Sequence, residues 1–212
     1  MIIRSAIFVL SLSLLSGCAE FENKLSGKTT PRVYVANESS NSVTVIDALT
    51  FKVIATVDPK NFSTHDLALS RDGTRLYATN LASGRLSVID TKALETIASI
   101  YTGGRCHVVA LTNDNRFAWV ANIGDDTISI VETEGYHIVD TLAVGKGPTG
   151  LTFSRDGNFA YVSNQGDKTV AVVDTTTYQL IKTIPVGSNP HFLTLVPDGR
   201  IWGANSGAMT FM

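Results

Sequence analysis

The segment RLYATNLASGRLSVID at residues 75–90 joins two runs rich in β-branched, aromatic and aliphatic residues through the turn-forming group ASG. Alternating runs around a glycine-containing turn predict a β-hairpin. The tetrapeptide of its first run recurs at steps of 43, 42, 42 and 41 residues, as YVAN at 34, YATN at 77, WVAN at 119, YVSN at 161 and WGAN at 202. One structural unit is therefore copied along the chain.

Each unit of about 42 residues contains four strand-like runs, exemplified by LALS, RLYATN, RLSVID and TIASIY, with turn groups such as RDG and GGR between them. No stretch after the N-terminal segment sustains a 3.6-residue period with helix caps, which argues against a helical repeat. Four short strands in a unit of this length are typical of a propeller blade. We therefore predict an all-β fold, a β-propeller of four-stranded antiparallel blades with about four and a half repeats of ~42 residues.

A family resemblance supports this prediction. The YVAN, YATN and YVSN segments, the runs VTVID, LSVID and VAVVD that follow them, the VG-x-x-P lead-ins at 144–148 and 186–190, and the RDG turns resemble the YVTN family of β-propeller repeats over roughly residues 32–205. The resemblance implies the propeller fold. It leaves the chemistry open, because that family includes surface proteins, lactonase-like enzymes and relatives of the haem-bearing propeller of cytochrome-type nitrite reductases.

The number of repeats is small for a closed ring. The repeat region begins with three strands of a blade, continues through three full blades and stops in a fifth unit. YVTN propellers more often look seven-bladed, which would need roughly 100 further residues. We expect a partial or truncated propeller, or an arc that a second chain completes, in preference to a closed four-bladed ring.

The N-terminal segment MIIRSAIFVLSLSLLSGC at residues 1–18 has one early cation, Arg4, and a short apolar run before a pair of small residues and Cys18. The run is too short to span a bilayer as a helix and is typical of a secretory signal. LSGC resembles the bacterial lipoprotein box, which implies that Cys18 is lipidated and anchors the mature chain. The alternative is an ordinary cleaved signal with a cysteine near the cut.

These features divide the chain into a lipoprotein-type signal peptide at residues 1–18, a polar tether at 19–31 and the propeller repeats at 32–212. We expect an exported protein, anchored to a membrane through Cys18 and facing the periplasm or the cell exterior. With 17 basic and 19 acidic residues and a formal charge of −2, the chain has no strong field for nucleic acid, so we expect no nucleic-acid partner. Cys106 is then the one remaining cysteine, and we expect a small buried thiol.

Most polar repeat positions have structural explanations. Aspartate or asparagine next to glycine suits tight turns in which the side chain binds nearby amides. This assigns turn roles to Asp72, Asp114, Asp156 and Asp198. All eight periodic acids are therefore poor candidates for catalysis, namely these four and Asp47, Asp90, Glu132 and Asp174. The sequence contains no CxxCH, GxSxG or HExxH motif and no phosphate-binding glycine loop, so we identify no catalytic residue and no metal site.

Three of the four histidines recur in the repeats without an evident structural role. They open the segments HDLALSRDG at 65–73, HVVALTNDN at 107–115 and HFLTLVPDG at 191–199, and the remaining copy has Thr149 at that position. In family propellers this segment is the innermost strand, which starts near one mouth of the central channel. Two interpretations remain: partly buried histidines bonded to loop carbonyls, or a ring of imidazoles that binds a ligand. The second names as candidate ligand-binding residues His65, Asp66, Arg105, His107, Lys146, Asn189 and His191.

Equivalent positions across a channel should lie on the order of 10 Å apart, too far for one metal ion to be shared by all three histidines. We therefore expect no cofactor, with haem or a transition metal as the alternative. The sequence favours a lipid-anchored, non-catalytic module that binds a protein or a small molecule. The alternative function is a lactonase-like hydrolase, or a haem- or metal-handling propeller that uses the same histidines.

Overall fold

The computed structural model describes residues 30–206 and 210–211. The signal peptide with Cys18 and all but the last two residues of the tether lie outside them. Within the described residues every regular element is a β-strand. No helix there is long and apolar enough to cross a membrane.

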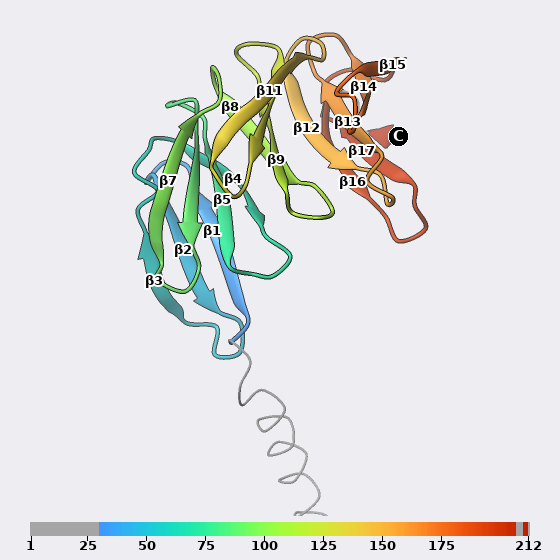
Figure 1. The fold of residues 1–212 in the computed structure, drawn as a ribbon. Coiled ribbons are helices and arrows are strands. Elements are labelled where there is room, and N and C mark those ends of the chain that lie inside the picture. The colour runs from blue at the N-terminus through green and yellow to red at the C-terminus, as the bar shows by residue number, and fades with distance from the viewer. Residues whose placement is uncertain (1–29, 207–209, 212) are drawn as a thin grey trace, which may run out of the picture.

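The strands form five antiparallel sheets, here called blades A to E, that follow one another around an open arc (Figure 1). Blade A comprises β1 (Arg32–Asn37), β2 (Ser42–Asp47) and β3 (Val53–Val57). Blade B comprises β4 (Thr64–Leu69), β5 (Arg75–Asn80), β6 (Arg85–Asp90) and β7 (Glu95–Tyr101). Blade C comprises β8 (Cys106–Leu111), β9 (Phe117–Asn122), β10 (Thr127–Glu132) and β11 (His137–Ala143).

Blade D comprises β12 (Pro148–Phe153), β13 (Phe159–Asn164), β14 (Thr169–Asp174) and β15 (Leu180–Pro185). Blade E comprises β16 (Pro190–Leu195), β17 (Ile201–Asn205) and β18 (Thr210–Phe211). The predicted all-β propeller of four-stranded antiparallel blades is confirmed, with three strands first, three complete blades next and a partial fifth.

The tetrapeptides show which strands are missing. Each lies in the second strand of a complete blade, yet YVAN lies in β1, the first described strand of blade A. Among the described residues blade A therefore has no innermost strand, and the inner edge of β1 has no strand paired with it. The inner strands that are present, β4, β8, β12 and β16, contact one another in turn along the concave side of the arc.

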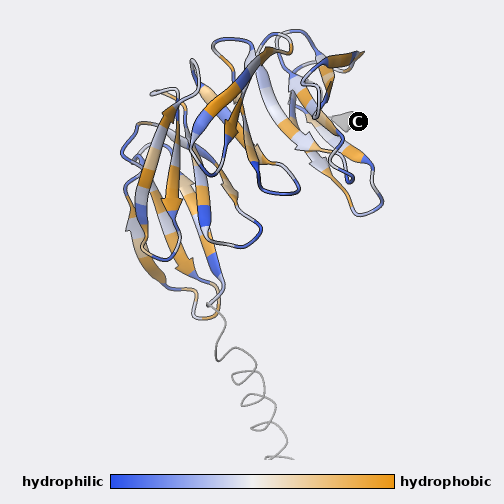
Figure 2. Ribbon diagram, viewed as in Figure 1, coloured by the Kyte–Doolittle hydropathy of each residue, from blue (hydrophilic) through white to orange (hydrophobic). Residues whose placement is uncertain are grey.

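Hydrophobic packing between successive sheets holds the blades together. Apolar residues run along the strands and polar residues gather in the loops (Figure 2). Val43 and Val45 of blade A pack against Leu76 and Ile89 of blade B, and all four are at most 2% exposed. Each such side chain contributes on the order of 1.5–3 kcal/mol when fully buried.

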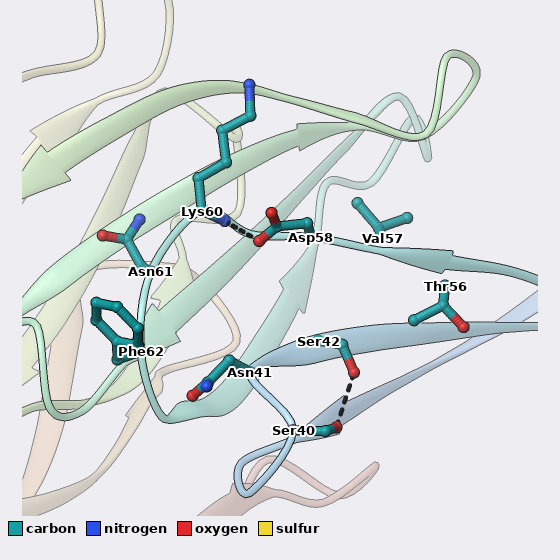
Figure 3. A pocket seen from close by; sticks show the side chains of 9 residues that line it. All are labelled: Ser40, Asn41, Ser42, Thr56, Val57, Asp58, Lys60, Asn61 and Phe62. Atoms are coloured by element: carbon teal, nitrogen blue, oxygen red, sulfur yellow. Dashed lines mark hydrogen bonds between the residues drawn. The ribbon is translucent and has the colours of Figure 1, made fainter.

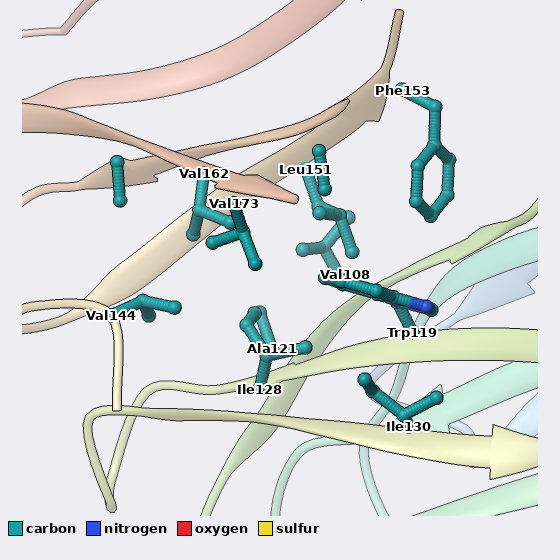
Figure 4. Close-up of a cluster of buried hydrophobic side chains, with 12 residues drawn as sticks. Val108, Trp119, Ala121, Ile128, Ile130, Val144, Leu151, Phe153, Val162 and Val173 are labelled. Carbon is teal, nitrogen blue, oxygen red and sulfur yellow. The ribbon is translucent and has the colours of Figure 1, made fainter. Parts of the chain in front are cut away.

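The largest cluster joins blades C and D. Trp119 and Ile130 of blade C pack with Leu151, Phe153 and other residues of blade D (Figure 4). The Trp119 ring meets the Phe153 ring edge-on at a centroid distance of 5.5 Å, a favoured aromatic geometry. Tyr77 of blade B packs in the same way against Val109 and Val120 of blade C.

The two ends of the arc lack this cover. Val33 of β1 is 47% exposed, whereas its counterpart in blade B, Leu76, is 2% exposed. Trp202 of β17 is 46% exposed, whereas its counterpart in blade C, Trp119, is fully buried. One sheet face at each end is therefore uncovered among the described residues, as expected for a partial propeller.

Hydrogen bonds explain the repeated polar positions. The Asn122 amide donates to the hydroxyls of Thr127 and Ser129 and to the Thr102 carbonyl, which ties the hairpin to the loop that leads into the blade. Asp72 accepts from the Ser70 hydroxyl and the Thr74 amide, and these bonds lower its pKa. Similar turn bonds engage the other periodic acids, so their predicted structural role is confirmed.

Replacing Trp119 with alanine should lower the free energy of unfolding by about 3–5 kcal/mol, because it empties the core between blades C and D. Trp202→Ala, at the equivalent position of blade E, is the matched control and should cost less than about 1 kcal/mol. Urea unfolding measures both. Equal losses would contradict the assignment of stability to packing between blades.

Candidate functional site

Each inner strand has an irregularity where the histidine position falls. The register of β4 with β5 shifts between Thr64 and Leu67, and that of β8 with β9 shifts between Cys106 and Val108. Blades D and E show the same shift at their equivalent positions. A β-bulge breaks the simple alternation of side chains and can redirect one of them, and such bulges often lie beside functional sites.

The bulges accompany an unexpected meeting of the three imidazoles. The ring centroids of His65 and His107 are 4.3 Å apart with planes tilted by 48°, and those of His107 and His191 are 5.4 Å apart and nearly perpendicular. The expected spacing of about 10 Å is therefore wrong for these pairs. It assumed regular strands around a wide channel, whereas the inner strands converge and are bulged at this position.

Two hydroxyls fix the backbone of the cluster. Thr79 Oγ1 donates to the His107 carbonyl oxygen at 2.9 Å, and Ser163 Oγ donates to the His191 carbonyl oxygen at 2.7 Å. Both hydroxyls occupy the third position of their tetrapeptides, YATN and YVSN, where the other copies have alanine. The blade before His107 and the blade before His191 thus each hold the following histidine in place.

His107 is the most enclosed of the three. It is 9% exposed, and its Nδ1 atom has no hydrogen-bond partner among the described residues. Burial lowers the pKa of His107 to about 4, and the neighbouring His65 and His191 add to this effect, while the Thr149 backbone opposes it. Burial likewise lowers the pKa of His191. His107 is therefore neutral at physiological pH and presents a ring nitrogen whose hydrogen bond is unmet.

Glu38 joins the site although the sequence analysis did not name it. Its carboxylate lies 3.3 Å from His65 Nδ1 and accepts a hydrogen bond from the Ser63 hydroxyl. The Ser63 bond and the His65 contact lower the pKa of Glu38. The available signal was a departure from the repeat, since the residue after the tetrapeptide is leucine, isoleucine or glutamine in the next three copies.

Asp66 and Thr149 serve the contacts between blades. Asp66 Oδ2 accepts a hydrogen bond from the Val109 amide of blade C at 3.0 Å, and burial raises the pKa of Asp66. Thr149 Oγ1 donates to the Pro190 carbonyl of blade E at 3.0 Å. Asp66 thus lies beside the histidines but has one oxygen engaged in joining two inner strands.

The other three candidate residues lie on the lead-in loops just before the inner strands. Arg105, Lys146 and Asn189 are all exposed. Arg105 and Asn189 have φ angles of 54° and 53°, in the left-handed region, and each stands two residues before a histidine. Arg105 is near enough to contribute to the lowered pKa of His107. The structure therefore places two cations, Arg105 and Lys146, in the loops that border the imidazole cluster.

The neighbouring cysteine is poorly suited to nucleophilic chemistry. Cys106 is fully buried, its thiol donates to the carbonyls of Asn80 and Arg85, and burial raises its pKa to about 11. The thiolate form that a nucleophile needs is therefore scarce at neutral pH. Among residues 30–206 and 210–211, no group of three or more His, Cys, Asp or Glu side chains is arranged to hold a metal ion.

Together these features define a β-propeller with a cluster of imidazoles where its inner strands begin. The model of the YNCE-like β-propeller family matches residues 92–199, and the chain belongs to this family. The YVTN-type resemblance seen in the repeats is thereby confirmed. No curated protein matches the chain.

Solved structures share the fold. The chain resembles a chain of hydrazine synthase from Kuenenia stuttgartiensis with 25% identity and a TM-score of 0.76, over 81% of this chain and 51% of that one. It resembles a functionally unknown protein from Desulfotomaculum acetoxidans at 16% identity and a TM-score of 0.71, over 87% and 66% of the two chains. A proposed 6-phosphogluconolactonase from Bacteroides uniformis shares 13% identity, with a TM-score of 0.69 over 88% and 67%. The chain thus spans about half to two thirds of the length of these proteins.

The lowered pKa of His107 makes a prediction about stability in acid. Between about pH 6.5 and pH 4 the unfolded chain protonates this histidine while the folded chain does not, so stability falls as the pH falls. His107→Asn should remove about 2–3 kcal/mol of that loss, and urea unfolding at a series of pH values measures it. His137→Asn, at an exposed histidine on β11, is the control. An unchanged pH profile in His107→Asn would contradict the assignment.

Proposed function

We propose that the chain is a non-catalytic binding module whose ligand site is the channel mouth formed around His65, His107 and His191. The observation that carries this proposal is the contact of three imidazoles from three different blades, beside exposed cations on the bordering loops. A ligand at the mouth would contact His65 and His191, which are both partly exposed.

The charges around the cluster favour an anionic group as the ligand. Arg105 and Lys146 are exposed cations on the bordering loops, and a neutral imidazole can donate a hydrogen bond to an anion through its N–H group. Glu38 is the opposing acid, and its carboxylate is already engaged by His65 and Ser63. A carboxylate or phosphate could therefore bind while raising the pKa of the imidazoles.

Binding is favoured over hydrolysis because the described residues near the mouth offer no activated nucleophile. Cys106 has a raised pKa, and the periodic acids are engaged in turns. The lactonase-like alternative stays a prediction, since likeness at 13% identity concerns the fold alone. The haem- or metal-handling alternative gains one observation, the contact between the rings, which brings imidazole ligands closer together than the sequence predicted.

Titration with citrate and inorganic phosphate, followed through the NMR signals of the histidine rings, tests this function. We expect the signals of His65, His107 and His191 to shift, and that of His137 to stay, with binding weakened at least tenfold in Arg105→Ala. If neither anion shifts the NMR signals of these three histidine rings, the proposal is overturned. An absorption change of added haem that requires His107, or lactone hydrolysis lost in His107→Asn, would replace it with one of the alternatives.

The proposed cellular setting follows from the N-terminal motif. We place the protein outside the cytoplasm, held to a membrane by lipid on Cys18, with residues 19–31 as the tether. Metabolic labelling with palmitate should mark the wild-type chain and not Cys18→Ser, which should leave the membrane fraction. If palmitate labels the wild-type chain and Cys18→Ser equally, or labels neither of them, the proposed lipid anchor at Cys18 is contradicted.

A protein partner is also proposed, namely a second chain that completes the propeller. Two features of the described residues support it: the inner edge of β1 has no paired strand, and the sheet faces around Val33 and Trp202 are exposed. Light scattering of the purified chain should then give a mass above that of one copy. A single-copy mass at every concentration would contradict association of this chain with itself.

A further inference from the structure

The loop that leads into blade B breaks the repeat. The carbonyl of Pro59 accepts from the Ser87 hydroxyl, just as the carbonyl of Thr102 accepts from the Ser129 hydroxyl one blade later. These carbonyls mark equivalent positions. Five residues then separate Pro59 from His65, whereas four separate Thr102 from His107. The first lead-in loop is therefore one residue longer than the second.

The inserted residue changes how the loop is held. In blade C the equivalent turn uses Gly103, where a Cβ atom would lie 2.7 Å from the Asn122 side chain. Blade B has Lys60 with a φ of 58° and then Asn61, whose buried amide donates to the hydroxyls of Ser87 and Ser99. A lysine in the left-handed region costs about 1 kcal/mol relative to glycine. The lead-in loop of blade B therefore contains a strained residue at a point where blade C has glycine.

A pocket of about 470 Å³ opens beside this loop, between the β1–β2 hairpin and the end of β3 (Figure 3). Its volume suits a small-molecule ligand. Seven of its nine lining residues have polar side chains, so the pocket offers hydrogen-bonding groups to a ligand. The lining residues are Ser40, Asn41, Ser42, Thr56, Val57, Asp58, Lys60, Asn61 and Phe62.

Phe62 stands out in this polar setting. It is 67% exposed, yet its backbone is held on both sides, because its amide donates to Ser83 Oγ at 3.1 Å and its carbonyl accepts from the same hydroxyl at 3.4 Å. A side chain this exposed adds little to the packing of the fold. Its face is available to stack against the C–H face of a ligand ring.

Two polar side chains near Phe62 have hydrogen-bonding atoms that remain available to a ligand. Asp58 Oδ1 accepts from the Lys60 amide at 2.7 Å, which leaves Oδ2 for a ligand hydroxyl. Asn41 Oδ1 accepts from the Ser63 amide at 2.7 Å, which leaves the Asn41 NH₂ group to donate. A carboxylate acceptor, an amide donor and an aromatic face together match a ligand that has hydroxyls on its edge and C–H groups on its face.

We propose that this pocket binds a saccharide, with one sugar ring stacked on Phe62 and its hydroxyls bonded to Asp58 and Asn41. The site is separate from the proposed anion site but linked to it. Asn41 bonds the Ser63 amide, the Ser63 hydroxyl bonds Glu38, and Glu38 contacts His65. The pocket is therefore built by the one lead-in loop that departs from the repeat, next to the first histidine.

Saturation-transfer NMR with glucose, galactose, N-acetylglucosamine and their β-linked disaccharides tests the proposal on the purified chain. We expect at least one of them to bind, and Phe62→Ala to weaken that binding about tenfold. Asp58→Asn should weaken it comparably. Phe192→Ala is the matched control, because Phe192 is also a strongly exposed phenylalanine, 62% exposed, but lies on blade E.

Because Phe62 is exposed, its replacement should leave the thermal midpoint unchanged, so a loss of binding can be attributed to the pocket. Absence of binding by every sugar, or binding that survives Phe62→Ala, would overturn the proposal. Response of the histidine rings to citrate should persist in Phe62→Ala, which separates failure of this site from failure of the channel-mouth site.

Discussion

The structure depends on one constraint: a sheet with apolar side chains on both faces must be covered on both by neighbouring sheets. Val43 and Leu76 meet this need between the first two blades, and Trp119 and Phe153 meet it two blades later. Packing of successive blades brings their inner strands into contact along one side of the arc. Residues 42 or 84 positions apart in sequence thereby become neighbours. This packing brings together the rings of His65, His107 and His191.

The two proposed sites have different structural origins. The imidazole cluster comes from repetition, because the same bulged position recurs in each inner strand and hydroxyls from Thr79 and Ser163 hold two of its members. The pocket beside Phe62 comes from a departure, because one lead-in loop contains an extra residue and accepts a left-handed lysine. A repeat fold can thus form a site either from a residue that recurs in several repeats or from a loop that differs in one repeat. Glu38 joins the two at the junction of blades A and B.

The fold could be predicted from the sequence because its signals act locally. Asp72 forms hydrogen bonds within its own turn, and Asn122 bonds residues only five and seven positions further on. The positions of these residues in the sequence therefore predict where the hairpins lie. The distances between histidines could not be predicted, because they depend on bulges and on the approach of separate sheets. Glu38 was missed for a similar reason. Its role depends on the neighbouring blade that presents His65, and its own hairpin offers one signal, a departure from the residue types of the other copies.

The central claim is that three imidazoles from three blades meet at the start of the inner strands. The most direct test is the measurement of nuclear Overhauser effects between ring protons in the purified chain with labelled histidines. The account predicts cross-peaks between His65 and His107 and between His107 and His191, whose centroids lie 4.3 and 5.4 Å apart. Absence of both cross-peaks in a folded sample would contradict the account, because it would place the histidines around a wide channel without contact.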